Sequence, residues 1–61
     1  MSKEHDYYYR LGRIAYEAYC GSTGWKSAIT GADLPLFDSC PGAVKDGWIE
    51  AAKAIILELA R

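Results

Sequence analysis

At 61 residues the chain can form one small domain, and a domain of this size buries only about 60% of its unfolded surface. Its composition is 51% apolar and 13% aromatic, which excludes a disordered chain and exceeds what two facing helices need, so we expect self-association. The net charge of −1 offers no basic surplus for neutralising phosphates, which argues against a general nucleic-acid binder.

Targeting, redox and metal signals point to a simple cytoplasmic protein. The first residues, Met-Ser-Lys-Glu-His-Asp, lack the apolar segment of a signal peptide, and no apolar run approaches about 18 residues, so we expect no membrane partner. Cys20 and Cys40 are expected to be reduced, buried thiols at the inner helix ends, although proximity in a hairpin leaves pairing open. One histidine and two isolated cysteines do not supply paired zinc ligands, so we expect no metal and no cofactor.

The first predicted helix runs from about residue 3 to residue 20, with Ser2 as its cap and Gly21 just past its end. Apolar residues recur on one face at helical spacing: Tyr7, Leu11, Ile14, Ala15 and Ala18. A polar ladder predicts the solvent face: Asp6, Arg10, Arg13 and Glu17. Gly12 costs a helix up to about 1 kcal/mol relative to alanine, so we expect it to allow close approach of another backbone or a ring.

Residues 21–39 form a connection much longer than the usual two to eight residues between helices. Trp25, Leu34 and Phe37 give this segment apolar anchors that a flexible linker lacks. The pattern therefore predicts an ordered loop, and we expect function to lie there.

The polar part of this loop has the chemistry of an anion site. Its glycine amides, Lys26 and Ser27 can form a concave nest for an anion. The segment is not a phosphate-binding P-loop, because Trp25 separates Gly24 from Lys26 and a helix precedes it. The alternative is a polar turn with a solvated lysine.

The second predicted helix runs from about residue 41 to residue 60, with Pro41 as its first residue and Ser39 or Cys40 as its cap. Its main apolar stripe contains Val44, Trp48, Ala51, Ala52, Ile55 and Leu59. A second stripe beside it contains Ile49, Ile56 and Ala60. One stripe can pack on the first helix, and the other needs the loop or another subunit. The expected fold class is all-α: two helices joined by a long ordered loop, completed by self-association.

Three consecutive tyrosines fan over the start of the first helix. Aromatic rings followed by arginine can stack on nucleobases, but they are also typical of protein interfaces. We favour a role in an interface or in the core for the tyrosines, and the expected interface residues are Tyr7, Tyr8, Tyr9, Ile49 and Ile56. No Ser/His/Asp or Cys/His arrangement has an evident geometry, so we expect no catalytic residues and no enzymatic activity.

A pattern covering residues 11–56 carries a resemblance. Its residues are Ile14-Ala-Tyr-Glu-Ala-Tyr19, Thr23-Gly-Trp-Lys-Ser27, Gly31, Leu34-Pro35, Phe37-Asp38, Trp48 and Ala51-Ala52-Lys-Ala54. In these residues the chain resembles a group of short phage and prophage accessory proteins. A second likeness is to the RyR-type repeat module, which has a helix with an Ala-Tyr-Cys-like ending, a loop and a second helix.

The resemblance implies a phage accessory protein that counters host defence in the host cytoplasm. Our leading expectation is a homo-oligomer that sequesters a small anionic ligand, such as a nucleotide immune signal, at a subunit interface. The residues expected to bind it are Arg10, Arg13, Tyr16, Trp25, Lys26, Ser27 and Thr30. The first alternative is an inhibitor or adaptor that binds a host defence protein, and the second is a structural phage component.

Overall fold

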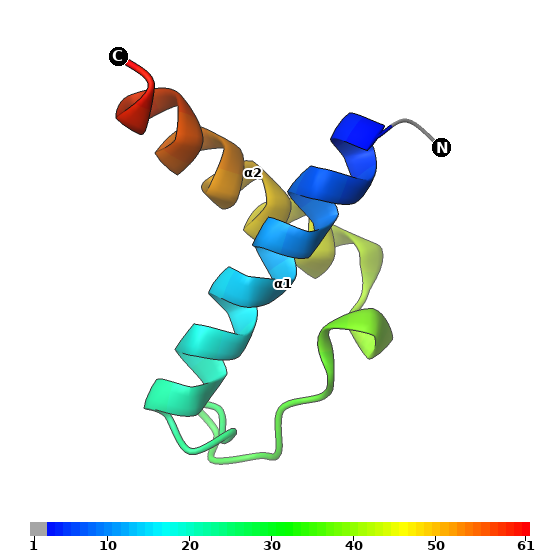
Figure 1. The fold of residues 1–61 in the computed structure, drawn as a ribbon. Helices are drawn as coiled ribbons and strands as arrows, with labels where there is room; N and C mark the ends of the chain where they lie inside the picture. The colour runs from blue at the N-terminus through cyan, green and yellow to red at the C-terminus, as the bar shows by residue number, and fades with distance from the viewer. Residues whose placement is uncertain (1–2) are drawn as a thin grey trace.

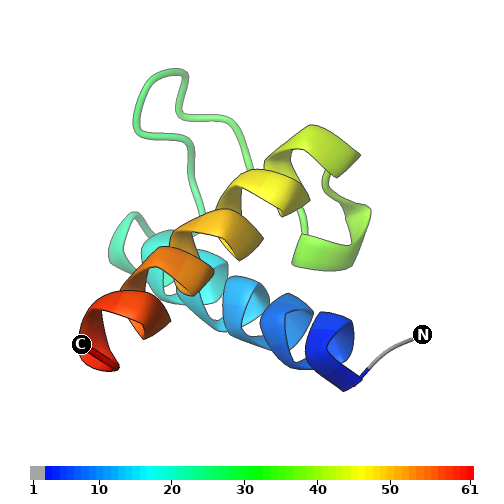
Figure 2. The ribbon, with the colours of Figure 1, turned by 90° about the horizontal axis from the view of Figure 1, so that it is seen from above.

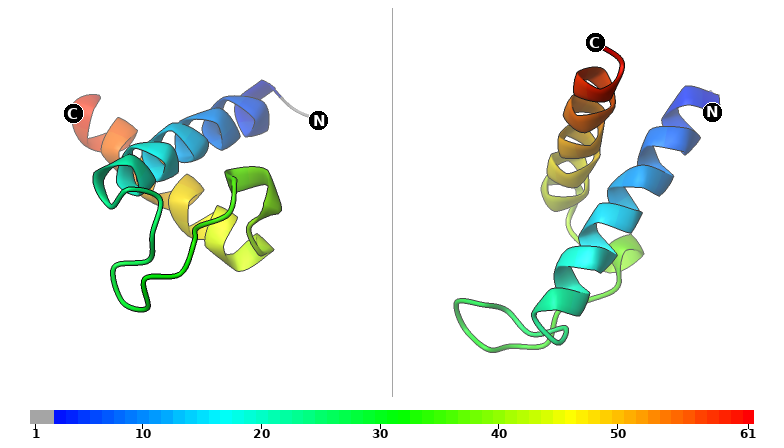
Figure 3. Two further views of the ribbon diagram at one scale, coloured as in Figure 1. Left: turned by 90° about the horizontal axis from the view of Figure 1, so that it is seen from below. Right: turned by 60° about the vertical axis from the view of Figure 1, so that its left-hand side comes forward.

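The computed structural model describes residues 3–61 and is all-helical, as the sequence predicts (Figure 1). Helix α1 spans Lys3–Ser22, a short 3-10 helix η1 spans Phe37–Ser39, and helix α2 spans Gly42–Leu59. A loop joins the two long helices, and its tip stands away from both of them (Figures 2 and 3). In the described part of the chain, the β-pairing is an isolated antiparallel bridge between Lys26 and Asp33.

The helix ends differ slightly from the predicted ones. Helix α1 continues through Gly21, which has open space around it, and ends at Ser22. Pro41 was expected to be the first residue of helix α2, but it is the N-cap, so the helix begins one residue later at Gly42. Ser39 belongs to η1 and does not cap α2. Ser2, the expected cap of α1, lies outside the described residues.

The two long helices cross each other (Figures 1 and 2), and Gly12 of α1 lies against Ile49 of α2. A Cβ atom built on Gly12 would lie 2.9 Å from Ile49 Cγ1 and 3.0 Å from the Ile49 N and Cα atoms. Real Cβ atoms essentially never come within 3.0 Å of another atom, and contacts of 3.0 Å are tighter than nine in ten real ones, so a side chain at position 12 would push the helices apart. The expectation that Gly12 allows close backbone approach is confirmed.

The core is a cluster of aromatic rings centred on Tyr16. The Tyr16 ring centroid lies 6.2 Å from that of Trp25, 5.5 Å from that of Phe37 and 5.8 Å from that of Trp48. Edge-on and tilted arrangements at these distances are favourable for aromatic pairs. Because Trp25 and Phe37 come from the loop, the prediction of an anchored loop is confirmed.

The face of α1 that packs inward is not the predicted one. The structure buries Gly12, Tyr16 and Cys20, whereas Tyr7 is 45% exposed and Ile14 is 53% exposed. The face with Gly12 and Tyr16 is buried in place of the predicted stripe because an aromatic ring buries a large area and Gly12 lets α2 approach. The polar ladder is exposed as predicted: Asp6, Arg10, Arg13 and Glu17.

The molecule is flat and exposes more surface than its mass requires. Its extents are 36 × 26 × 15 Å, and its radius of gyration is 12.4 Å, against about 10.5 Å for a compact 61-residue domain. Its accessible surface is 4539 Å², whereas a folded monomer of 6.7 kDa has about 3,900 Å². The excess of roughly 600 Å² consists partly of apolar side chains on both long helices.

Candidate functional site

The polar residues of the loop form a closed hairpin. Ser27 N donates to Ala32 O at 2.7 Å, and Leu34 N donates to Trp25 O at 2.9 Å. Trp25, with φ of 61°, and Gly31, with φ of 75°, adopt the left-handed backbone that this turn requires.

Within the hairpin, the expected ligand-binding groups bond to the chain itself. Lys26 Nζ donates to Asp33 Oδ1 in an exposed ion pair. Ser27 Oγ accepts from the amides of Ile29, at 3.2 Å, and Thr30, at 3.1 Å. Thr30 Oγ1 accepts from a further backbone amide in the turn. These groups stabilise a turn and line neither of the two hollows described below.

The backbone amides after α1 are also engaged. Cys20 O accepts from Thr23 N at 3.1 Å and from Trp25 N at 2.7 Å, and Lys26 N donates to Thr23 O at 3.3 Å. The two bonds to Cys20 O satisfy a carbonyl at the end of α1, where helices leave such groups unpaired. The glycine amides expected to hold an anion are engaged as well, because Gly24 N donates to Gly21 O at 3.3 Å and Gly31 N donates to Ser27 O at 2.9 Å.

The remaining expected ligand residues are distributed over α1 and the core. Tyr16 is buried, and its hydroxyl donates to Pro35 O at 2.7 Å. Arg10 lies 5.7 Å from the Tyr7 ring centroid and about 18 Å along the helix axis from Ser22, where the loop begins. Arg13 is exposed. The single chain thus does not bring the arginines together with Lys26.

The phenol of Tyr16 and the thiols of Cys20 and Cys40 are buried together in the core. Burial raises the pKa of Tyr16 above its usual range, and the Cys40 and Cys20 thiols nearby raise it further. Both thiols are free and buried, as expected for small apolar groups at helix ends. A neutral Tyr16 is therefore the hydrogen-bond donor that fixes the loop.

The five predicted interface residues fall in different environments. Tyr7 is exposed, whereas Tyr8 is half-buried with Lys53 Nζ 5.2 Å from its ring centroid. Tyr9 packs edge-on against a core ring and donates to Asp38, and this bond raises the pKa of the Tyr9 phenol. Ile49 lies in the core at the helix crossing, so it is not available to a second chain.

An apolar groove of about 350 Å³ runs between the two long helices. We call it the α1/α2 groove. Its lining is Tyr7, Leu11, Ile14, Ala15, Ala52, Ile55, Ile56 and Leu59. These are largely the stripes that the sequence predicted as buried, and no charged residue is among them.

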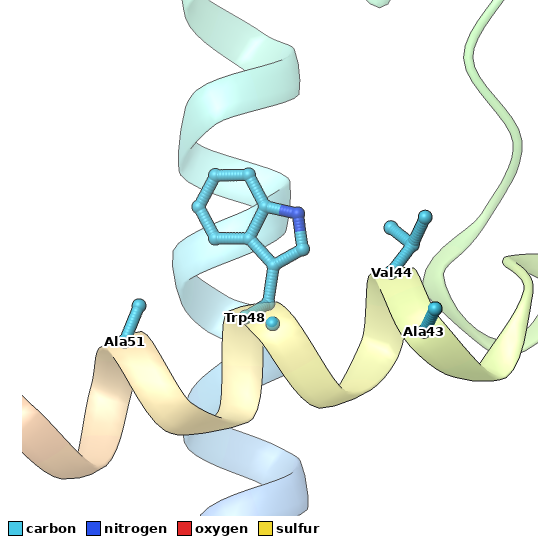
Figure 4. Close-up of a pocket in the computed structure, with 5 residues that line it drawn as sticks. Ala43, Val44, Trp48 and Ala51 are labelled. Carbon is cyan, nitrogen blue, oxygen red and sulfur yellow. The ribbon is translucent and has the colours of Figure 1, made fainter.

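A second hollow, of about 410 Å³, is lined by residues of α2: Ala43, Val44, Gly47, Trp48 and Ala51. We call it the Trp48 hollow. Figure 4 shows the Trp48 indole standing between Val44 and Ala51 on one side of the helix. Trp48 is half-buried, with its ring centroid 5.4 Å from that of Tyr19. Sequence reasoning missed this hollow, although Ala43, Gly47 and Ala51 recur every fourth residue beside the tryptophan.

The described residues were also compared with the patterns of metal sites, membrane-spanning helices and known proteins. Among residues 3–61 no three His, Cys, Asp or Glu side chains are grouped to hold a metal ion. No helix in this part of the chain is both long and apolar enough to cross a membrane. No protein-family model, curated protein or solved structure matches the chain.

Proposed function

We propose that this protein is a non-enzymatic phage accessory protein that acts in the host cytoplasm by binding a host defence protein. The observation that carries the proposal is the Trp48 hollow, in which a half-buried tryptophan stands on a rigid helix among small exposed side chains. Tryptophan is one of the residues enriched among interface hot spots. The resemblance to short phage and prophage proteins supplies the class of partner.

The neighbourhood of Trp48 suits an incoming side chain. Tyr16 and Tyr19 hold its ring from the α1 side. Val44, which is 41% exposed, forms one wall of the hollow, and the hydrogen atom of Gly47 leaves its floor open. A preformed aromatic wall binds with little loss of side-chain entropy.

A pair of exposed alanines on α2 makes a matched test. Ala51→Glu places a carboxylate in the Trp48 hollow, whereas Ala54→Glu places the same group on an exposed position outside both cavities described above. Tagged protein with its wild-type sequence should retain a stoichiometric host protein from lysate. Ala54→Glu should retain it and Ala51→Glu should lose it. Equal retention by both variants would overturn the proposal.

Sequestration of a small anionic ligand is the second candidate, and the exposure of the Lys26 ion pair favours it. The Lys26 and Asp33 side chains are 56% and 84% exposed. Exposed ion pairs contribute only about 0–1 kcal/mol, so a polyanionic ligand can displace the carboxylate. Thermal shift with cyclic nucleotides and ADP-ribose derivatives tests this. Stabilisation that grows in Asp33→Asn and disappears in Lys26→Ala would support it, and no shift in any variant would contradict it.

A further inference from the structure

The α1/α2 groove has the properties of a surface that is covered in the working protein. We infer that it is the interface of a two-fold symmetric dimer, in which each copy of this chain covers the groove of the other. The groove shares no lining residue with the Trp48 hollow, so this inference stands or falls separately from the proposed host partner.

The chemistry of the lining favours a permanent partner over a transient one. All eight lining residues are aliphatic or aromatic, and Ile14, Ile55 and Leu59 are 53%, 57% and 81% exposed. Interfaces between permanent subunits are more apolar than transient ones, and they resemble a domain core cut in half. A surface of this composition is costly to leave in water.

The absence of charge in the lining lets the groove face a second copy of itself without electrostatic repulsion. In a two-fold dimer the same patch of both copies meets itself. A patch with a charged residue near its centre would then bury like charges together or leave one unpaired. The groove carries none, so two copies can meet without that penalty.

The single chain also has exposed surface for a second copy to cover. The chain exposes roughly 600 Å² more than a folded monomer of its mass, at 4539 Å² against about 3,900 Å². A standard stable interface buries about 800 Å² on each partner. Part of this exposed surface lies in the groove, where the Ile14, Ile55 and Leu59 side chains are 53%, 57% and 81% exposed, so a symmetric contact there would cover large apolar side chains.

Two exposed leucines near the end of α2 allow a matched test of the groove. Leu59 lines the groove and is 81% exposed, whereas Leu57 does not line it and is 68% exposed. Leu59→Glu and Leu57→Glu therefore make the same chemical change two residues apart. Both positions are exposed in the single chain, so neither variant should lose helix content, which circular dichroism checks. Ile14→Glu on α1 is a second groove variant if Leu59→Glu unfolds.

Sedimentation equilibrium of the full chain, from about 1 μM to about 1 mM, gives the test. The wild-type chain and Leu57→Glu should sediment at twice the 6.7 kDa chain mass. Leu59→Glu should weaken the dimer by about 100-fold or more, because dimerisation would bury an unpaired carboxylate. A wild-type monomer throughout this range, an assembly of any other size, or equal weakening by the two leucine variants would each overturn the inference.

Discussion

Replacing Gly12 with alanine puts a methyl group at the crossing of α1 and α2. The new carbon would lie 2.9 Å from Ile49 Cγ1 and 3.0 Å from two backbone atoms of Ile49. The side-chain atom can rotate away, but the backbone atoms belong to the middle of α2. The helices must therefore move apart at their closest point, which loosens the packing of Tyr16 beneath them.

The size of the effect follows from two opposing contributions. Overpacking a tight contact costs about 1–3 kcal/mol. Alanine returns up to about 1 kcal/mol of helix propensity relative to glycine. We expect Gly12→Ala to lower the free energy of unfolding by up to about 2 kcal/mol, which corresponds to a Tm lower by up to about 15 °C in a chain of this length.

Gly47 supplies the matched control, because it lies inside α2 and a Cβ there meets nothing within 4 Å. Gly47→Ala should raise the free energy of unfolding by about 0.5–1 kcal/mol. Urea unfolding followed by circular dichroism, at one fixed protein concentration because self-association shifts the midpoint, measures both variants. If Gly12→Ala stabilises the protein as Gly47→Ala does, the close crossing described above is wrong.

The remaining predictions concern the loop and its anchors. The hydrogen bond to Asp38 raises the pKa of Tyr9, and burial raises the pKa of Tyr16, from the unfolded value of 10.0. The contribution of the two neutral phenols to the free energy of unfolding is therefore complete below pH 10.0. It falls as the pH rises through their higher folded pKa values. Urea midpoints measured across this alkaline range should therefore fall, and Tyr9→Phe should reduce the fall; a flat profile would contradict this. Ser27→Ala removes the acceptor of two turn amides and should cost about 0.5–1.5 kcal/mol, with faster hydrogen exchange at those amides and unchanged exchange in α2. Gly31→Ala should cost about 1–2 kcal/mol because its φ is 75°, and Gly31→Asn should cost less in the same unfolding assay; equal costs would argue against the left-handed turn.

The sequence was informative where the signal is local. Helical spacing gave both long helices to within about two residues, and Gly12 indicated a close contact inside a helix. The aromatic residues of the loop predicted that it would pack on the core. Each of these inferences depends on properties of neighbouring residues, which a single chain displays directly.

The choice of buried face was beyond the sequence. Helix α1 carries one apolar stripe through Leu11 and Ile14 and another face through Gly12 and Tyr16, and both have helical spacing. The packing of Tyr16 among the core rings and the fit of Ile49 against Gly12 decide between them, and the second contact joins positions 37 residues apart. The predicted stripe became the α1/α2 groove for this reason.

The polar part of the candidate site also depended on the turn. Residues other than glycine seldom adopt positive φ, so nothing in the sequence indicated that Trp25 would do so. That conformation is part of the turn that brings Lys26 opposite Asp33, which engages the amine expected to bind a ligand. An isolated lysine near glycines therefore resembled an anion site more than it resembled half of an ion pair.

The C-terminal half of α2 extends past the point where the helix crosses α1 at Gly12, so a small change in the crossing angle moves its end. The loop and its aromatic rings brace the start of α2, whereas its far end extends beyond them (Figure 1). Leu59 lies ten residues beyond Ile49, or about 15 Å along the helix axis. A rotation of about 5° at the crossing then moves that end by about 1.3 Å. The spacing between the helices in the α1/α2 groove varies with this angle, so whatever fills the groove also fixes the shape of the molecule.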